Sequence, residues 1–409
     1  MRSGVLNEAA HASATKSQPF HQTREKWGSG WEPGSVPSWE IRRKLLRTWL
    51  AVTARGVVWL LGFAAMERIP SRISPQVRSR IPSLDGLRAI SISLVVAGHW
   101  AELRYHSDVA GAFANLGVRI FFVISGYLIT TLLLKEHGKT STIGLREFYV
   151  RRAFRILPAA VTFMLPVFVI FWHELRWYHM AAAALYLANF DFAHPWFLGH
   201  LWSLSVEEQF YFLWPGVLKR WFRHRVGILA GVIAFAPLYR VGCHFLGLHG
   251  RADETFPAVA DVLAVGCLLA IFAPRLPKIK PVWALLMIVP IAVVPAYAGM
   301  LRFHLTALLL FVLWPAMHLS IAGLLLHAVQ QPYRILNARP VVWLGQISYS
   351  LYLWQQLFVY GTHPRAWYFV FFALALACAS YYLVEQPMLR LRDRRKRERE
   401  TEDVLASAA

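Results

Sequence analysis

The stretch LDGLRAISISLVVAGHW, residues 84–100, places a cation and an imidazole within one apolar segment. Arg88 and His99 are eleven residues apart, which on an α-helix is a rise of about 16 Å that ends on nearly the same face. Imidazole is the usual general base near neutral pH. Asp85 lies three residues before Arg88, where its carboxylate can cap the helix start and pair with the arginine. The pattern predicts a catalytic His99, reached along a helix face that begins at Arg88.

The same two residues also have a structural interpretation. Arg88 would then anchor the helix at the cytoplasmic face, and His99 would be a hydrogen-bonded packing group. Ionisable side chains inside a membrane bundle cost about 2.5–3.5 kcal/mol for Arg or Asp on insertion scales, and they are by default candidates for function. The residues by themselves leave both interpretations open.

A second polar group lies in the stretch HLWSLSVEEQFYFLWP. Ser203, Glu207 and Tyr211 follow one another at intervals of four residues, so they share one helix face. The Glu207 carboxylate is expected at a depth in the membrane comparable with that of His99. There it can orient the imidazole and stabilise its cationic form. Alternatively, Glu207 and the adjacent Glu208 are solvated at the membrane surface. We favour a functional role for Glu207 over one for Glu208.

A third group, in the stretch FYVRRAFRILP, consists of Arg151, Arg152 and Arg155 at the start of an apolar segment. Arginine forks and helix N-termini both suit phosphate groups. Anchoring at the cytoplasmic face explains the charge of this group, but not the use of arginine rather than lysine. We interpret these residues as a candidate phosphate-binding site.

Two small residues, Ser125 and Gly126, lie in the middle of the apolar stretch GVRIFFVISGYLIT. Small side chains at such a position let helices approach closely or leave room for a chain. We interpret both as packing residues that support the site.

The composition indicates which kind of secondary structure holds these polar residues. The chain has 409 residues, of which 56% are hydrophobic, 14% aromatic and 16% charged. A soluble chain of this length would have about one quarter charged residues, and apolar runs near the length of a membrane span recur along most of the sequence. We predict an all-α, polytopic integral membrane helical bundle.

The formal charge of +20 does not indicate nucleic-acid binding. Lys and Arg cluster in short connectors between apolar runs, where they set the topology of a membrane protein. Cys243, Cys267 and Cys378 lie singly in apolar stretches, without the spacing of a metal site or of a secretory disulfide framework. We expect no nucleic-acid partner and no metal site.

The apolar runs predict about ten transmembrane helices. Ten spans with a cytoplasmic start place most connector Lys and Arg inside, whereas counting 180–199 as an eleventh span would reverse every connector after the third. We therefore predict cytoplasmic N- and C-termini and treat 180–199 as an outer-face or re-entrant segment. The predicted spans are 87–105, 115–134, 154–173, 203–218, 226–246, 256–273, 282–298, 304–326, 340–360 and 366–388.

The membrane part is flanked by two polar segments. We predict that residues 1–80 form a cytoplasmic extension. It is disordered at first and continues as a basic amphipathic helix over 42–66. Residues 81–390 form the predicted membrane domain. Residues 391–409 are a charged tail, which we expect to lie as a helix against anionic cytoplasmic lipid.

Taken in their order along the chain, the sequence motifs resemble those of the acyltransferase family 3 membrane proteins, bacterial O-acyltransferases that modify sugars and antibiotics. The resemblance implies a multi-pass protein of the bacterial cytoplasmic (inner) membrane. It implies catalysis by Arg88 and His99, donor binding by Arg152 and Arg155, and a serine–glutamate motif at Ser203 and Glu207. It covers about residues 82–390 and rests on LDGLRAISISLVVAGH, FFVISGYLI, FYVRRAFRILP, HLWSLSVEEQFYFLWP, GQISYSLYLWQQ and YYLVEQPM.

Two positions depart from the family pattern. Many relatives carry an arginine two residues before Asp261, where this chain has Val259. We therefore expect Asp261 to lack that partner. Many relatives also carry a histidine at the position of Gln355, so a second catalytic histidine is excluded there.

The resemblance implies transfer of an acyl group, by default acetyl, from cytoplasmic acyl-CoA to a hydroxyl. The expected acceptors are a carbohydrate, a glycolipid or a glycosylated natural product, and the enzyme would hold no bound cofactor. We expect the pantetheine arm to pass Arg88 and bring the thioester to His99, which acts as a general base or becomes acylated itself. Glu207 would stabilise the imidazolium in either route. The alternative is a proton-coupled transporter or lipid flippase, with His99 and Glu207 as a proton relay.

Overall fold

The computed structural model describes residues 81, 83–191, 193–248, 254–304, 309–359 and 369–408. All regular elements in these ranges are helices, which confirms the predicted all-α class. The predicted extension 1–80 lies outside the described residues, and this includes the predicted amphipathic helix over 42–66.

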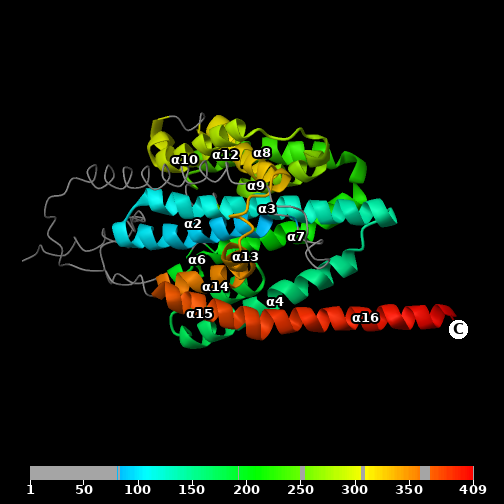
Figure 1. The fold of residues 1–409 in the computed structure, drawn as a ribbon. Coiled ribbons are helices and arrows are strands. Elements are labelled where there is room, and N and C mark those ends of the chain that lie inside the picture. Colours follow the sequence, from blue (N-terminus) through cyan, green and yellow to red (C-terminus); the bar gives the residue numbers. More distant parts are fainter. Residues whose placement is uncertain are drawn as a thin grey trace, which may run out of the picture. The chain divides into compact units, whose positions relative to one another are not determined.

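The main helices follow one another with short connections, and Figure 1 shows them lying side by side. In chain order they are α2 (Leu84–Tyr105), α3 (Asp108–Thr140), α4 (Leu145–Ile170), α5 (Trp177–Ala184), α6 (Trp196–Gly199), α7 (Leu201–Arg220), α8 (Arg225–Phe245), α9 (Phe256–Phe272), α10 (Pro281–His304), α12 (Trp314–Gln330), α13 (Arg339–Gln346), α14 (Ser348–Val359), α15 (Phe369–Ser380) and α16 (Gln386–Ala408). Two π-helical turns, Leu309–Leu313 and Tyr381–Glu385, precede α12 and α16.

The structure supports a membrane protein. Within the described residues, six helical stretches are long and apolar enough to cross a bilayer. Helices α2 and α7 are not among the six, and these two carry His99 and Glu207. The count of about ten spans therefore stays a prediction. The six stretches are Asp108–Thr140, Leu145–Ile170, Phe222–Phe245, Phe256–Arg275, Phe311–Gln330 and Val370–Arg395.

Among its described residues, 180–191 and 193–199, the segment 180–199 contains no long helix. It consists of the end of α5, a single 3₁₀ turn at Ala188–Phe190 and the four-residue α6. Helices this short cannot cross a bilayer, in agreement with our choice to leave this segment out of the spans. The segment instead brings Trp196 close to α2, as described below.

Helix α3 packs closely against α2 and α9. The contact with α9 depends on two glycines, because a Cβ added at Gly126 would overlap the carbonyl oxygen of Leu263, and one at Gly266 would overlap that of Val123. Small residues allow such close backbone approach in membrane helices. Gly126 is thus a packing residue, as its sequence context predicted.

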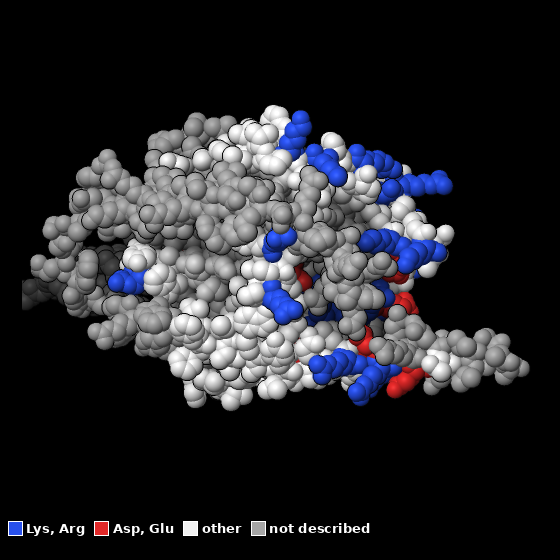
Figure 2. Space-filling model, viewed as in Figure 1, with Lys and Arg blue, Asp and Glu red and all other residues white. Residues whose placement is uncertain are grey.

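Basic side chains gather at one end of the helices. Figure 2 shows most of the visible Lys and Arg side chains at the end toward which α16 runs. The ends of α3 and α7 lie there together, since the rings of His137 and Phe222 are 3.8 Å apart at their centroids. A basic end of this kind is expected of the cytoplasmic side of a membrane protein.

A buried ionic cluster connects α3, α8, α9 and α12. Oδ2 of Asp261 is 3.0 Å from an Nη atom of Arg240 and 3.5 Å from Nδ1 of His318. Nε2 of His318 is 3.0 Å from Arg119, whose guanidinium stacks over Trp314 at 3.9 Å. As expected from Val259, Asp261 lacks the arginine of the family pattern two residues before it, but it does not lack an arginine partner altogether. Helix α8 supplies the arginine from 21 residues away.

Candidate active site

His99 lies on α2 and contacts a residue of α14. Its Nδ1 is 3.1 Å from Oε1 of Gln355, which is fully buried. An amide oxygen only accepts hydrogen bonds, so Nδ1 donates and Nε2 keeps its lone pair. The ring of Trp196 meets the imidazole edge-on, with the two centroids 5.8 Å apart. His99 therefore presents one tautomer, whose Nε2 can take a proton from a hydroxyl.

Glu207 lies in a different hydrogen-bond network. Its carboxylate accepts hydrogen bonds from the hydroxyls of Ser125 and Tyr211, and these two hydroxyl oxygens are 3.0 Å apart. We expected Glu207 to orient His99, but in the described structure Gln355 holds that position. The reason is that α7 directs this carboxylate toward Ser125 on α3 rather than toward the imidazole on α2. Ser125 and Tyr211 thus hold the Glu207 carboxylate, although Ser125 had been interpreted from the sequence only as a packing residue.

Ser203 lies one turn before Glu207 on α7 but has other partners. Its Oγ is 2.5 Å from the hydroxyl of Tyr352 and 3.1 Å from the carbonyl oxygen of His200. The backbone N–H of His200 donates to Oε1 of Gln356, 2.8 Å away. Tyr352 and Gln356 both belong to α14, the helix that also carries the partner of His99. Ser203 therefore helps to fix the start of α7 against α14.

The predicted arginines form a cluster at the other end of α2. Arg155 interacts electrostatically with both Arg88 and Arg152, and with Glu385 as a counter-charge. The guanidinium of Arg152 stacks over the ring of Tyr211, 3.6 Å from its centroid. Nε of Arg88 and Nε of Arg152 are buried without a hydrogen-bond partner among the described residues. Three neighbouring cations, two of which have an unused Nε donor, are suited to an anion such as a phosphate.

Arg151 and Asp85, which we also predicted for the site, have other surroundings. Arg151 is exposed and forms an ion pair with Glu136 of α3 at 3.2 Å. It therefore differs from Arg152 and Arg155, although all three come from α4. Asp85 lies in the first turn of α2, where its backbone carbonyl packs closely against Gly345. Its pairing with Arg88 stays a prediction.

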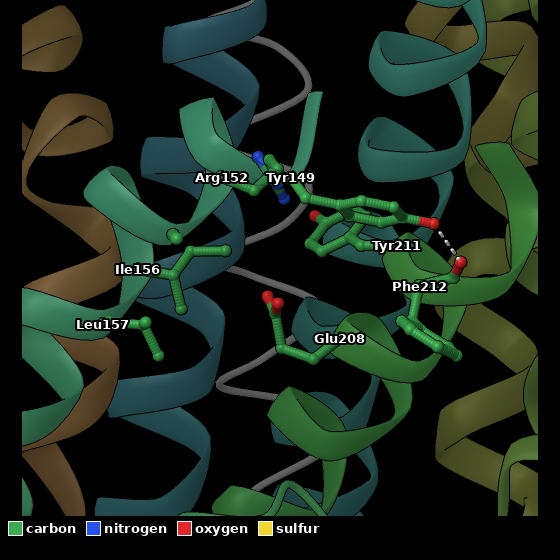
Figure 3. A pocket seen from close by; sticks show the side chains of 8 residues that line it. Tyr149, Arg152, Ile156, Leu157, Glu208, Tyr211 and Phe212 are labelled. Carbon is green, nitrogen blue, oxygen red and sulfur yellow. Dashed lines mark hydrogen bonds between the residues drawn. The ribbon is translucent and has the colours of Figure 1, made fainter. Parts of the chain in front are cut away.

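A cavity of about 170 Å³ lies beside the arginine cluster, between α4 and α7. Arg152, Ile156, Glu208 and Tyr211 line it, and Figure 3 shows Glu208 pointing from α7 toward the α4 side chains. Glu208 interacts electrostatically with Arg152. The cavity thus combines an apolar wall with one acidic and one basic group.

Sequence reasoning missed two of these contacts. Gln355 was noted only because it replaces a histidine of the resembling family, and Glu385 only as part of the motif YYLVEQPM. The signal for Gln355 was the pair of amide side chains at positions 355 and 356 in an otherwise mostly apolar helix. Glu208 had been given less weight than Glu207, whereas in the structure it is the glutamate that lines the cavity.

Residues 81–384 match the family described as an acyltransferase domain. The chain is 28% identical over 337 residues to the peptidoglycan O-acetyltransferase OatA of Listeria monocytogenes. The aligned region covers 70% of this chain and 50% of the relative. It is 30% identical over 379 residues to the candidate peptidoglycan O-acetyltransferase YrhL of Bacillus subtilis, which covers 75% of this chain and 55% of the relative.

A candidate O-acetyltransferase of Staphylococcus aureus is 29% identical over 363 residues, covering 75% of this chain and 57% of the relative. The chain therefore spans about half the length of the curated relatives it matches. No solved structure matches the chain.

Proposed function

The chain belongs to the acyltransferase family that it matches over residues 81–384, and from this membership we propose that it transfers an acetyl group from acetyl-CoA to a hydroxyl of a carbohydrate. Relatives named for peptidoglycan O-acetylation make an amino sugar of peptidoglycan the first acceptor to test. The proposal places the reaction within the membrane, at His99.

The observation that carries the proposal is the arrangement of one helix. Helix α2 bears Arg88 in a cluster of three arginines and, eleven residues later, the half-buried His99 with a free Nε2. The rise between the two residues is about 16 Å, roughly half the thickness of the hydrocarbon core. Acetyl-CoA would bind with its phosphates at Arg152 and Arg155. Its pantetheine arm would then bring the thioester to the imidazole.

Two chemical routes fit this geometry. In the first, His99 Nε2 removes the proton of the acceptor hydroxyl as it attacks the thioester. In the second, Nε2 itself attacks the thioester and carries the acetyl group to the acceptor. Intact-mass measurement of the protein after incubation with acetyl-CoA alone separates them. An added acetyl group that is absent from His99→Ala assigns the covalent route, and unmodified protein assigns the general base.

The central test measures release of the CoA thiol. Full-length protein in detergent is mixed with acetyl-CoA and with peptidoglycan fragments, and the free thiol is followed. We expect acceptor-dependent release that His99→Ala abolishes. His106→Ala is the matched control, because His106 is exposed at the end of the same helix. Substrate movement coupled to protons without thiol release would instead establish a transporter.

A further inference from the structure

Two buried N–H groups beside His99 have no hydrogen-bond partner among the described residues. They are Nε2 of Gln355 and Nε1 of Trp196. Gln355 contacts His99 through its amide oxygen, and the indole of Trp196 meets the imidazole edge-on. Both donors therefore belong to side chains that touch the candidate catalytic residue.

Buried donors without partners are rare in folded proteins, and each needs a physical explanation. The indole N–H can only donate, and the amide nitrogen can only donate as well. His200 also has unpartnered ring nitrogens, but its ring packs against Phe163 and Tyr352. The two donors beside His99 thus require an acceptor atom that the described side chains do not supply.

Acyl transfer generates such an acceptor at this place. When a nucleophile adds to a thioester, the carbonyl oxygen becomes negatively charged next to the base that receives the proton. Fixed donors in a site shielded from water are the most effective means of stabilising that charge. Gln355 is fully buried and its orientation is set by the bond to His99, so its N–H needs no reorganisation when the charge develops.

We propose that Nε2 of Gln355 and Nε1 of Trp196 donate hydrogen bonds to the carbonyl oxygen of the acetyl group during its transfer. This rests on the proposed function and assigns two further catalytic residues to the same site. Gln355 then has two tasks, since its oxygen fixes the His99 tautomer and its nitrogen binds the reacting carbonyl.

The bonds balance as follows in the general-base route. The acceptor oxygen bonds to the carbonyl carbon, its proton moves to Nε2 of His99, and the electron pair of the C=O double bond moves to the oxygen that faces Gln355 and Trp196. The double bond then reforms, the C–S bond breaks, and the CoA thiolate takes the proton from the imidazolium. The products are the O-acetyl ester and free CoA.

The test uses the infrared band of the thioester carbonyl. Acetyl-CoA labelled with ¹³C at the carbonyl is bound to the full-length protein in nanodiscs, without an acceptor, and compared with unlabelled acetyl-CoA. Hydrogen bonds to the carbonyl oxygen polarise the bond, so we expect the bound band at lower wavenumber than the free one. Trp196→Phe keeps an aromatic ring against His99 and removes the N–H. Gln355→Glu keeps an oxygen that accepts from Nδ1 and removes the amide N–H.

Each variant should lose part of the wild-type shift. The matched control is Trp354→Phe, because Trp354 is also a buried indole with an unpartnered N–H, but it packs against Phe163. That variant should keep the full shift. With an acceptor present, removal of one such donor should lower kcat about 10²–10³-fold with little change in KM for acetyl-CoA.

The outcomes are distinguishable. If acetyl-CoA binds and its carbonyl band stays at the free position, or if all three variants keep the wild-type shift, the donor site is refuted while the proposed function stands. If acetyl-CoA does not bind to the protein, the proposed function fails and this inference fails with it. Size-exclusion and thermal-unfolding profiles identify any variant that has merely lost its fold.

Discussion

Nδ1 of His99 and Oε1 of Gln355 lie 3.1 Å apart, although the two residues are separated by 256 positions in the sequence. The bond joins α2 to α14 and leaves Nε2 of the imidazole free. From the sequence, Gln355 had served only to exclude a second catalytic histidine at this position. In the structure it holds the partner that sets the tautomer of His99.

Replacing Gln355 by leucine should therefore reduce the rate of transfer. Leu is similar in size but cannot accept a hydrogen bond, so the imidazole can rotate and adopt either tautomer. We expect kcat to fall by about 10²-fold or more, the scale associated with general acid–base groups. Steady-state CoA release measures this. Gln355→His should restore much of the rate, because an imidazole nitrogen can also accept from Nδ1. An activity of Gln355→Leu close to that of the wild type would contradict this role.

Arg152→Ala should weaken the binding of acetyl-CoA. A hydrogen bond to a charged group contributes about 1.5–3 kcal/mol, so we expect KM for acetyl-CoA to rise about 10- to 100-fold while kcat changes little. Arg151→Ala is the matched control, because Arg151 is exposed and paired with Glu136. Equal effects of the two substitutions would show that general positive charge, and not the cluster, determines donor binding.

Glu207→Ala should act mainly on the donor rather than on the proton transfer. The carboxylate accepts a hydrogen bond from Tyr211, and the Tyr211 ring stacks under Arg152. Loss of the carboxylate leaves the tyrosine free to move and the arginine less well placed. We expect KM for acetyl-CoA to rise about tenfold, the scale of one hydrogen bond. Glu207→Gln, which keeps an acceptor oxygen, should be milder. A selective loss of kcat would instead restore our original assignment of Glu207 to His99.

Asp261→Ala should destabilise the helix bundle. It leaves Arg240 buried without its carboxylate, and breaking a buried ion pair in this way costs about 3–5 kcal/mol. Thermal unfolding in detergent, followed by tryptophan fluorescence, should show a clearly lowered midpoint. The double variant Arg240→Met, Asp261→Leu should recover most of the loss, because Arg240 is then no longer a buried cation without its carboxylate. A midpoint equal to that of the wild type would show that water or lipid satisfies Arg240.

The sequence was sufficient to predict the helical class and the approximate helix positions. The sequence also predicted that Arg88 and His99 lie on the same helix, α2, since helical periodicity is a local property. The same holds for Glu207 and Tyr211, which lie one turn apart on α7 and do interact. Such contacts depend only on spacing along one helix.

Contacts between helices could not be predicted in this way. The partner of His99 comes from α14 and the partner of Asp261 comes from α8, and neither follows from the residues nearby in sequence. The number of spans does not follow from hydropathy for a related reason. Helices α2 and α7 bear the polar groups of the site, so hydropathy alone does not identify them as membrane-crossing.

The close packing of α3 on α9 has a consequence for the site. Ser125, which donates to Glu207, directly precedes Gly126, the residue in backbone contact with Leu263. The height of that serine hydroxyl in the bundle is thus set by two main chains touching, not by adjustable side chains. A single methyl group at Gly126 would push α3 away from α9, and the displaced Ser125 hydroxyl would no longer meet the Glu207 carboxylate on α7.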